Sequence, residues 1–302
     1  MITSNPLWKL MKPTIDTIST ENLSKSQVCI GKGKLVTLES MSDGYIDDME
    51  VAGLTLFSEK PEGGARAAED ITIGGTKRYI PKTFAKYVQI TEEALEDNKY
   101  KEALQLVKRL TASAWKTQDI DVANAMLAST TVVGGYDNVA LASTSHVLPT
   151  GATQSNYMNA SGVTYTPSYQ AVVQARTWAT QILGPNGLPD PVELKAVVCP
   201  EAQRDLWQTI LGTPQMPGTM LNDINTVKSY GLELIPIRWF DSISTTFWGC
   251  LTDVENGLRA LQRRKLRSDS WVADNEMVMN YGMSYRMALG WSNWRFWLQG
   301  NT

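Results

Sequence analysis

Histidine is almost missing from this sequence, whose 302 residues include only His146. A single histidine excludes the HExxH zinc motif and any metal site built from a histidine cluster. A Ser-His-Asp triad would have to use His146, but its surroundings, ASTSHVLPTG, are rich in Ser, Thr, Gly and Pro and predict a loop. The GxSxG motif that presents a nucleophilic serine is also missing. We expect a loop histidine that hydrogen-bonds locally, with a catalytic His146 in an uncharacterised α+β enzyme as the alternative.

Cysteine is scarce as well. Cys29, Cys199 and Cys250 are far apart in the chain, and none of them belongs to a CxxC pair. This spacing predicts neither a zinc site nor a disulfide framework, and it fits a reducing compartment. The GKGK stretch at 31–34 lacks the spacing of both phosphate-binding motifs, GxxxxGK(S/T) and GxGxxG. We therefore predict no metal, no cofactor and no enzymatic activity.

Long apolar runs are missing too. No run approaches the ~20 residues that a membrane-spanning helix needs. Residues 1–14 contain Pro6 and Pro13 but no apolar core, so they do not resemble a signal peptide. No membrane partner is expected.

The sequence does contain enough apolar material for a large core. Hydrophobic residues make up 43% and charged residues 20%, so the chain has room for one large domain or two modest ones and is not disordered. The formal net charge of -3 argues against a protein whose whole surface holds nucleic acid.

The beginning of the chain contains two segments that cannot bury much by themselves. Residues 1–42 have weak periodicity and predict an extended arm that lies on a neighbouring subunit. Residues 44–57 and 69–81 carry β-branched and aromatic residues at strand-like spacing, with the turn-forming Pro-Glu-Gly-Gly between them. They predict a long β-hairpin over 43–80 with a flexible tip. Such a hairpin is marginal alone, so it needs a partner surface.

Residues 91–128 predict the longest helix. Thr91 is a suitable N-cap with glutamates after it, and Asp97-Asn98 is expected to interrupt the first turns. From Tyr100 onward apolar residues recur at helical spacing. The helix would span ~40 Å, long enough to be a spine along which other elements pack. Asp119 and Asp121 lie two apart on it, so they point to different faces and make a poor catalytic pair.

The rest of the chain predicts further helices and strands. Residues 129–168 are rich in loop-forming residues. The sequence then predicts an amphipathic helix at 168–184, a buried strand at 193–200, a helix at 201–211, strands at 230–240 and 245–252, and antiparallel strands from 271 onward, with Gly282 and Gly290 as bends or bulges. Six of the ten tryptophans follow position 238, and we expect core and interface anchors rather than a base-stacking platform.

Opposite charges collect in two segments. The segment 43–70 holds eight acidic and two basic residues, whereas the segment 259–267 is basic and has no acidic residue. We predict that the acidic hairpin of one subunit docks over the basic stretch of another, since complementary charge fixes register and partner choice. The alternatives are two solvated surfaces that never meet, and a basic stretch that contacts the phosphates of packaged DNA. The candidate contact residues are Asp47, Asp48, Glu50, Glu59, Glu62, Glu69, Asp70, Arg259, Arg263, Arg264, Lys265 and Arg267.

The order of these segments resembles the major capsid proteins of tailed bacteriophages, which have the Hong Kong 97-type fold. KYVQITEEALEDNKYKEAL resembles the extended segment that leads into the family's spine helix. YDNVALASTSHVLPTGATQSN resembles the loop after that helix, although Val147 interrupts the pattern. The resemblance covers nearly the whole chain, and its remaining parts are the helix, turn, strand and helix of 165–213, the strands of 221–240 and 247–261, and the closing strands of 274–300.

The resemblance implies an α+β, Hong Kong 97-like capsid fold with an N-terminal arm, an extended β-hairpin loop, a long spine helix, a peripheral domain and an axial domain. In this sequence the arm is 1–42, the extended loop is 43–80, the axial domain is 168–252, and the peripheral domain takes 81–167 and 253–302, including the spine helix at 91–128.

The resemblance also implies a function. A major capsid protein self-assembles as hexamers and pentamers into an icosahedral shell around double-stranded DNA, which it contacts non-specifically. Its place is the virion capsid, and the host cytoplasm during assembly. Many relatives begin with a helical scaffolding segment that a protease removes. This chain runs from Met1 straight into the arm, so a separate scaffold protein is expected, with portal and decoration proteins as further partners. Lys60 and Lys77 lie in or near the hairpin, but we predict no isopeptide chemistry. The alternative within the same fold is an encapsulin-type bacterial compartment shell.

Overall fold

The computed structural model describes residues 27–300, apart from 32–34, 37, 61, 67, 72, 92, 94–96, 98–99, 159–164, 216–222, 256 and 274–277. Most of the predicted arm therefore lies outside the described residues. The chain forms two compact units: unit 1 takes Met1–Tyr45, Ile80–Val122 and Ala260–Leu289, and unit 2 takes Ile46–Tyr79, Ala123–Arg259 and Gly290–Thr302. Helix and sheet occur in both units, so the predicted mixed class is confirmed.

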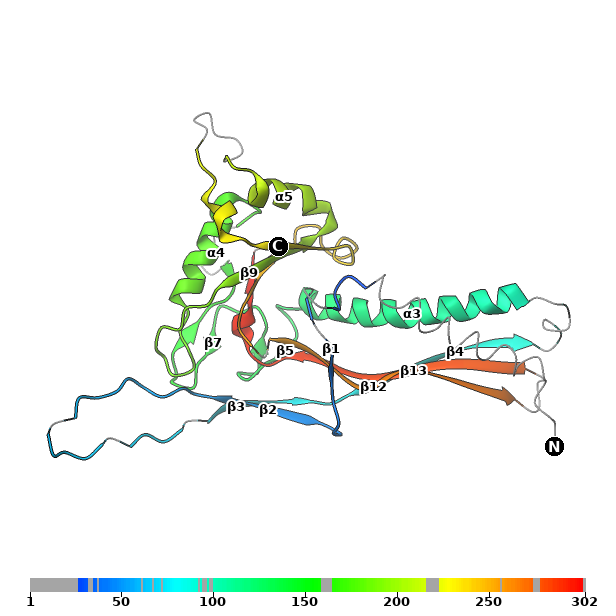
Figure 1. Cartoon of the computed structure of the whole chain (residues 1–302), viewed down its shortest axis with the longest axis horizontal. Coiled ribbons are helices and arrows are strands. Elements are labelled where there is room, and N and C mark those ends of the chain that lie inside the picture. Colours follow the sequence, from blue (N-terminus) through cyan, green and yellow to red (C-terminus); the bar gives the residue numbers. More distant parts are fainter. Residues whose placement is uncertain are drawn as a thin grey trace. The chain divides into compact units, whose positions relative to one another are not determined.

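Unit 1 is built on a four-stranded sheet. Its strand order is β1 (Leu38–Ser40), β12 (Leu258–Ala273), β13 (Val278–Trp291) and β4 (Lys82–Thr91). β1 runs parallel to β12, whereas β13 runs antiparallel to β4. The long helix α3 (Tyr100–Leu127) lies along one face of this sheet, as Figure 1 shows.

The contact between α3 and the sheet is apolar. Val107 and Leu110 of α3 pack with Met279, Tyr281 and Met283 of β13. The two helix residues lie three apart and the strand residues alternate, so each set forms one face directed at the other. Burial of each such side chain stabilises the fold by about 1.5–3 kcal/mol, which holds the helix on the sheet.

Of the helix predicted over 91–128, the structure describes α3 from Tyr100 onward and one helical hydrogen bond before it, from the N–H of Asp97 to the carbonyl oxygen of Glu93 at 2.9 Å. Thr91 is the last residue of β4 and pairs with Val278 across the sheet. An N-cap residue itself has extended backbone, so this pairing does not conflict with the predicted cap. The predicted end of the helix is confirmed within one residue, since α3 ends at Leu127.

The described part of the arm is tied to α3 by Asp119. Its carboxylate accepts hydrogen bonds from the backbone N–H groups of Val28 (2.9 Å), Cys29 (2.7 Å) and Ile30 (3.3 Å). Asp121 lies near Lys82 instead, and burial raises the pKa of its carboxyl group. The two carboxylates therefore serve different surroundings, as predicted.

Unit 2 contains a second four-stranded sheet, in the order β10 (Glu233–Ile237), β9 (Leu194–Pro200), β11 (Gly249–Thr252) and β14 (Trp297–Gln299). β10 runs parallel to β9, and β11 runs antiparallel to both β9 and β14. The buried strand predicted at 193–200 is confirmed as β9, which has neighbours on both sides.

Helices α4 (Tyr169–Gln181) and α5 (Arg204–Gly212) pack on this sheet. Trp207 and Trp248 meet in their shared core, with ring centroids 4.9 Å apart. The helix predicted at 168–184 is confirmed, with Ser168 as its N-cap, and it ends at Gln181 because Ile182 is already extended. The helix predicted after Pro200 is also confirmed, since the short turn η2 (Glu201–Gln203) leads directly into α5.

Two short hairpins fill the predicted loop region after α3. They pair β5 (Val133–Gly134) with β6 (Val139–Ala140), and β7 (His146–Val147) with β8 (Thr153–Gln154). A further turn, η3 (Thr226–Tyr230), precedes β10.

The predicted long hairpin is present in unit 2. β2 (Ile46–Val51) pairs antiparallel with β3 (Ile73–Tyr79), and residues 52–72 form the loop between them. The first strand ends at Val51, well before Phe57, and its ladder with β3 shifts register between Met49 and Val51 before it ends at the Val51–Ile73 pair. The hairpin is therefore shorter in its paired part, and longer in its loop, than the sequence predicts.

The closing strands are confirmed, but Gly282 is not a bulge. Pairing of β13 with β4 runs unbroken through Gly282 and Tyr87. Glycine is needed there for space, because a Cβ atom would lie 2.9 Å from the ring of Trp271. Four of the six late tryptophans are buried, namely Trp248, Trp291, Trp294 and Trp297.

Among the described residues, no helix has the length and apolar character that crossing a membrane requires.

Candidate subunit interface

The base of the hairpin is held by ion pairs within the chain. Asp47 and Arg78 face each other across β2 and β3, with 2.6 Å between their charged atoms. Hydrogen bonding from Arg78 lowers the pKa of the Asp47 carboxyl group. Both side chains are exposed, so this pair adds little to stability.

Asp48 leads a buried polar chain. It lies 3.2 Å from Arg259 and accepts a hydrogen bond from the Ser292 hydroxyl at 2.6 Å. Ser292 is in turn 2.5 Å from the Tyr79 hydroxyl, and burial raises the pKa of Tyr79. Asp48 and Arg259 belong to the two predicted contact segments, and they meet inside one subunit.

Glu50 has a partner that the sequence did not indicate. It lies 3.1 Å from Arg295, which follows β13, and both side chains are almost fully buried. Arg295 also donates to the carbonyl oxygen of Leu183 at 3.0 Å. The acidic residues of β2 are therefore engaged within the chain, and they fix the hairpin to the rest of unit 2.

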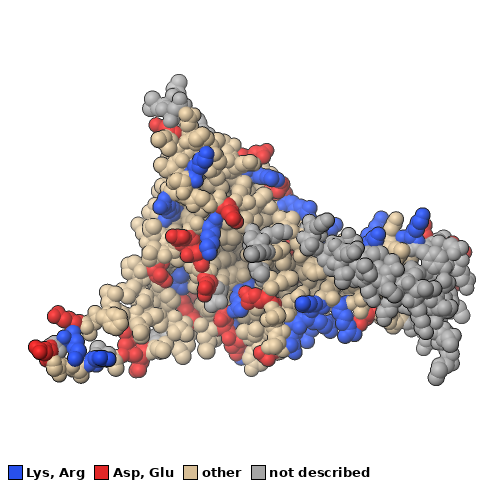
Figure 2. Space-filling model, viewed as in Figure 1, with Lys and Arg blue, Asp and Glu red and all other residues tan. Residues whose placement is uncertain are grey.

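The loop 52–72 presents a different surface. Glu69 accepts hydrogen bonds from the backbone and hydroxyl groups of Thr55, while Glu59, Glu62 and Asp70 are exposed. Figure 2 shows acidic and basic side chains together at the far end of this loop.

Apolar side chains of the same loop point into solvent. Phe57 is 103% exposed and Leu56 is 78% exposed, with Leu54 and Ile71 also largely exposed. Several exposed apolar side chains in one loop are typical of a surface that a partner covers.

The basic stretch lies on β12, which the sequence did not predict as a strand at that point. Leu266 packs into the core beneath α3, so its neighbours Lys265 and Arg267 point to the opposite face of the sheet. Arg263 has the same direction and is also exposed. Figure 2 shows lysine and arginine side chains gathered over β12.

The basic residues differ in how they are engaged. Arg263 donates to the backbone carbonyl of Ser42, and Arg267 pairs with Asp269 at 2.6 Å. Arg264 is half-buried and donates to the Ser284 hydroxyl at 3.0 Å. Lys265 is exposed. Two exposed aromatic residues, Tyr87 and Trp271, pack together on this face with ring centroids 5.6 Å apart.

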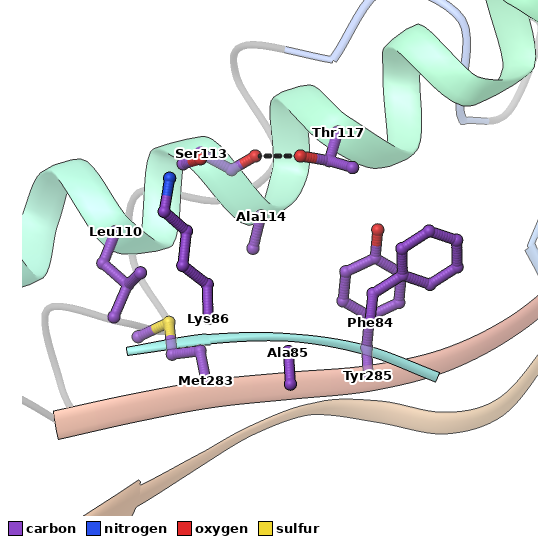
Figure 3. A pocket seen from close by; sticks show the side chains of 9 residues that line it. All are labelled: Phe84, Ala85, Lys86, Leu110, Ser113, Ala114, Thr117, Met283 and Tyr285. Atoms are coloured by element: carbon purple, nitrogen blue, oxygen red, sulfur yellow. Dashed lines mark hydrogen bonds between the residues drawn. The ribbon is translucent and has the colours of Figure 1, made fainter. Parts of the chain in front are cut away.

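A small cavity lies between α3 and the sheet of unit 1 (Figure 3). It measures about 150 Å³ and is lined mostly by apolar atoms, among them the stacked rings of Phe84 and Tyr285. The Thr117 hydroxyl beside it donates to the backbone carbonyl of Ser113. This lining offers packing space rather than a set of convergent catalytic groups.

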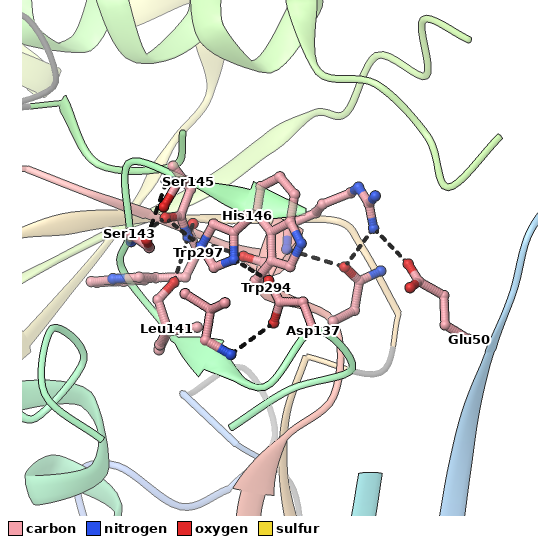
Figure 4. A network of polar contacts seen from close by, with 12 residues as sticks. Glu50, Asp137, Leu141, Ser143, Ser145, His146, Trp294 and Trp297 are labelled. Carbon is pink, nitrogen blue, oxygen red and sulfur yellow. Dashed lines mark hydrogen bonds and ion pairs between the residues drawn. The ribbon is translucent and has the colours of Figure 1, made fainter. Parts of the chain in front are cut away.

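His146 is completely buried, and it hydrogen-bonds locally as predicted. Its Nδ1 lies 2.5 Å from Asp137 and its Nε2 lies 3.0 Å from Asn156 (Figure 4). Its ring stacks on Trp294 with 4.2 Å between centroids. Neither Asp137 nor Asn156 was predicted as a partner, although both lie within ten residues of His146.

The comparisons with known proteins agree on the kind of molecule. The fold is similar to the capsid structure of the cyanophage P-SCSP1u, with 14% identity, a TM-score of 0.58, and 94% of this chain and 92% of that chain covered. It is also similar to a structure from Mycobacterium phage Patience, with 11% identity, a TM-score of 0.55 and coverage of 99% and 88%. A virus-like particle from Pyrococcus furiosus gives 9% identity, a TM-score of 0.54 and coverage of 98% and 100%. A comparison with curated proteins finds no match.

At these identities the likeness shows a fold shared with these structures. A family model described as phage capsid protein matches residues 74–299, and the chain belongs to that family. It is a major capsid protein that forms a shell, and its place is the virion capsid. The match favours neither the encapsulin-type shell nor the α+β enzyme that the sequence left as alternatives.

Proposed function

We propose that this protein has the Hong Kong 97-type fold and assembles as hexamers and pentamers into an icosahedral shell that encloses double-stranded DNA. In this proposal the arm is 1–42, the extended loop 43–80 and the axial domain 168–252. The peripheral domain takes 81–167 and 253–302, and the role is structural rather than enzymatic. A separate scaffold protein, a portal and decoration proteins are its further partners, and the packaged DNA is contacted non-specifically.

The observation that carries this proposal is the loop 52–72. Its apolar side chains, with Phe57 fully exposed, have no core within their own subunit. The base of the same hairpin is held by the Asp48–Arg259 and Glu50–Arg295 pairs. A loop with a fixed base and an uncovered apolar tip suits contact with a neighbouring subunit, and closed symmetry repeats each such contact around the shell.

The contact that we propose between subunits involves fewer residues than the sequence suggested. Asp47, Asp48 and Glu50 have partners in their own chain, which leaves Glu59, Glu62 and Asp70 of the loop to face outward. Their complement is the exposed basic row on β12, namely Lys265 together with Arg263 and Arg267, which also contact the Ser42 carbonyl and Asp269 of their own chain. Apolar contacts of the loop would supply most of the affinity, and these charges would fix its register.

Charge reversal tests this contact. The double change Arg263→Glu with Lys265→Glu should reduce particle formation by roughly tenfold or more at low salt, because ~1.4 kcal/mol of lost interaction corresponds to a factor of ten. Adding Glu59→Lys and Glu62→Lys to the same chain should restore particles. The readout is electron microscopy with sedimentation at low and high salt, since screening weakens exposed charge pairs.

A matched control reverses Lys101 and Lys108, which are exposed on α3. This control should assemble normally. If reversal at Arg263 and Lys265 leaves particle yield and salt sensitivity unchanged, the docking contact does not exist. If particles form but hold less DNA, the basic row faces the packaged genome instead.

A further inference from the structure

Three segments of unit 2 meet at the ring of His146. Asp137 lies in the turn between β5 and β6, Asn156 follows β8, and Trp294 begins the short turn η4 (Trp294–Phe296). His146 is 0% exposed, and the Asp137 side chain is 5% exposed. These contacts tie the short hairpins after α3 to the end of the chain (Figure 4).

The amide of Asn156 has only one sensible orientation. Its Nδ2 donates to the carbonyl oxygens of Leu141 at 2.6 Å and Trp297 at 3.0 Å, and Trp294 offers a third carbonyl at 3.4 Å. Its Oδ1 accepts from the backbone N–H of Ser143 at 2.9 Å. A flipped amide would set oxygen against three carbonyl oxygens and nitrogen against an N–H donor.

The fixed orientation of the Asn156 amide determines which ring nitrogens of His146 must carry a proton. Oδ1 of Asn156 is an acceptor, so Nε2 of His146 has to be a donor. Nδ1 lies 2.5 Å from the Asp137 side chain, and an ionised carboxylate only accepts, so Nδ1 has to donate to it as well. A neutral imidazole has only one N–H group and cannot meet both demands.

We propose that His146 is an imidazolium in the folded protein, and that its second proton joins the turn between β5 and β6, through Asp137, to the strand β7. Together with Asp137 it forms a buried ion pair of zero net charge. The neighbouring charged groups are Arg295, whose guanidinium lies 4.7 Å from the Trp294 ring centroid, and Glu50, which Arg295 neutralises. Loss of the proton to solvent would break the bond to Asp137 and leave one buried negative charge without a partner.

This role differs from the catalytic one that a lone histidine invites. The ring has no exposed surface, and its partners are a carboxylate, a side-chain amide and an indole face. The proton is held in place for structure, and the inference does not depend on how subunits contact one another.

The test uses the fact that the chain has one histidine, so labelling with ¹⁵N-histidine gives signals from His146 alone. The full chain is measured at pH 8 by nuclear magnetic resonance, in solution or as assembled shells. A free histidine is neutral at that pH. We expect both ring nitrogens to be protonated in the folded protein, and one to be bare after unfolding in urea. A bare ring nitrogen in the folded protein overturns the proposal.

The change Asp137→Asn gives a second, independent reading. The new side-chain amide can donate to Nδ1, which lets a neutral ring satisfy both of its neighbours. We expect one bare and one protonated nitrogen in this variant at pH 8, whereas a merely structural histidine would show no change in protonation. If Asp137→Asn does not fold, the wild-type spectrum still decides the question. A folded variant with two protonated nitrogens would contradict the role of Asp137.

Discussion

At the scale of single residues, Asp119 shows how much one side chain can organise. Both of its oxygens accept backbone N–H groups from residues 28–30, and it is only 1% exposed. Few local preferences hold the arm in place, and this carboxylate fixes the backbone of three consecutive residues on α3. Hydrogen bonds to a charged acceptor are stronger than neutral ones, so we expect Asp119 to contribute most to this attachment, with the Gln27–Gln118 bond beside it.

The change Asp119→Asn should therefore destabilise the fold by about 2–3 kcal/mol, because it sets an amide nitrogen against buried N–H donors. The matched control is Asp121→Asn on the same helix. Burial already raises the pKa of Asp121, so neutralising it should cost little. Free energies of unfolding in urea distinguish the two variants, and equal losses would contradict the role given to Asp119.

The burial of two of the three cysteines predicts how their thiols react at a given pH. Burial raises the pKa of Cys199 to about 12 and that of Cys250 to about 12. At pH 8 only about one thiol in ten thousand is then ionised. We expect no alkylation of either residue in the folded protein at pH 8, and complete alkylation after unfolding, as read by mass spectrometry.

The same two thiols also determine the direction in which the free energy of unfolding changes with pH. Above pH ~8.5 an unfolded chain releases thiol protons that the folded chain keeps, so the free energy of unfolding should fall as the pH rises toward 12. Rapid alkylation of Cys199 or Cys250 in the native state would show that the core of unit 2 opens more readily than its packing implies.

At the scale of elements, the base of the hairpin contains two ion pairs in contrasting surroundings. The Glu50–Arg295 pair is buried, and the Asp47–Arg78 pair is exposed. Breaking a buried pair leaves a charge without compensation, whereas water replaces a lost partner at the surface.

Arg295→Met should accordingly cost about 3–5 kcal/mol of folding stability, and Arg78→Met should have little effect. Adding Glu50→Gln to Arg295→Met should recover part of the loss, since it removes the unpaired charge. Thermal and urea unfolding provide the measurement. Similar losses for the two arginine variants would mean that the buried pair does not anchor the hairpin.

Elements with strong local patterns were predictable from the sequence. The spacing of Val107 and Leu110 indicated the spine helix, and the apolar run of 193–200 indicated a buried strand. Element boundaries were not predictable, because contacts from distant residues decide them. Residues of β13 extend β4 to Thr91, and the ladder of β2 with β3 shifts register between Met49 and Val51, which no local signal marks.

The candidate interface was predictable only as a list of charges. Sequence separates Asp48 from Arg259 by 211 positions, so nothing local tells that they meet within one subunit. The face of the sheet on which the basic row lies could not be predicted from the sequence either, because it follows from the packing of Leu266 beneath α3. The partners of His146 were nearer, and a search for acceptors within ten residues would have found Asp137 and Asn156.

At the scale of the whole molecule, the loop 52–72 is the segment that one subunit does not complete. It exposes apolar side chains at the end of a firmly held hairpin, whereas the described part of the arm packs on α3 of its own subunit through Gln118 and Asp119. In a protein that acts alone, such apolar side chains would stay in contact with water. In a shell every subunit presents one loop and covers another, so the apolar side chains are buried.

The measurement that tests this claim most directly is electron microscopy of the purified full chain, together with its mass distribution in solution. The account predicts closed shells, tubes, or rings of six and five subunits, with assembly increasing with protein concentration. A monodisperse monomer at high concentration, in both low and high salt, would contradict the claim that this chain builds the shell by itself.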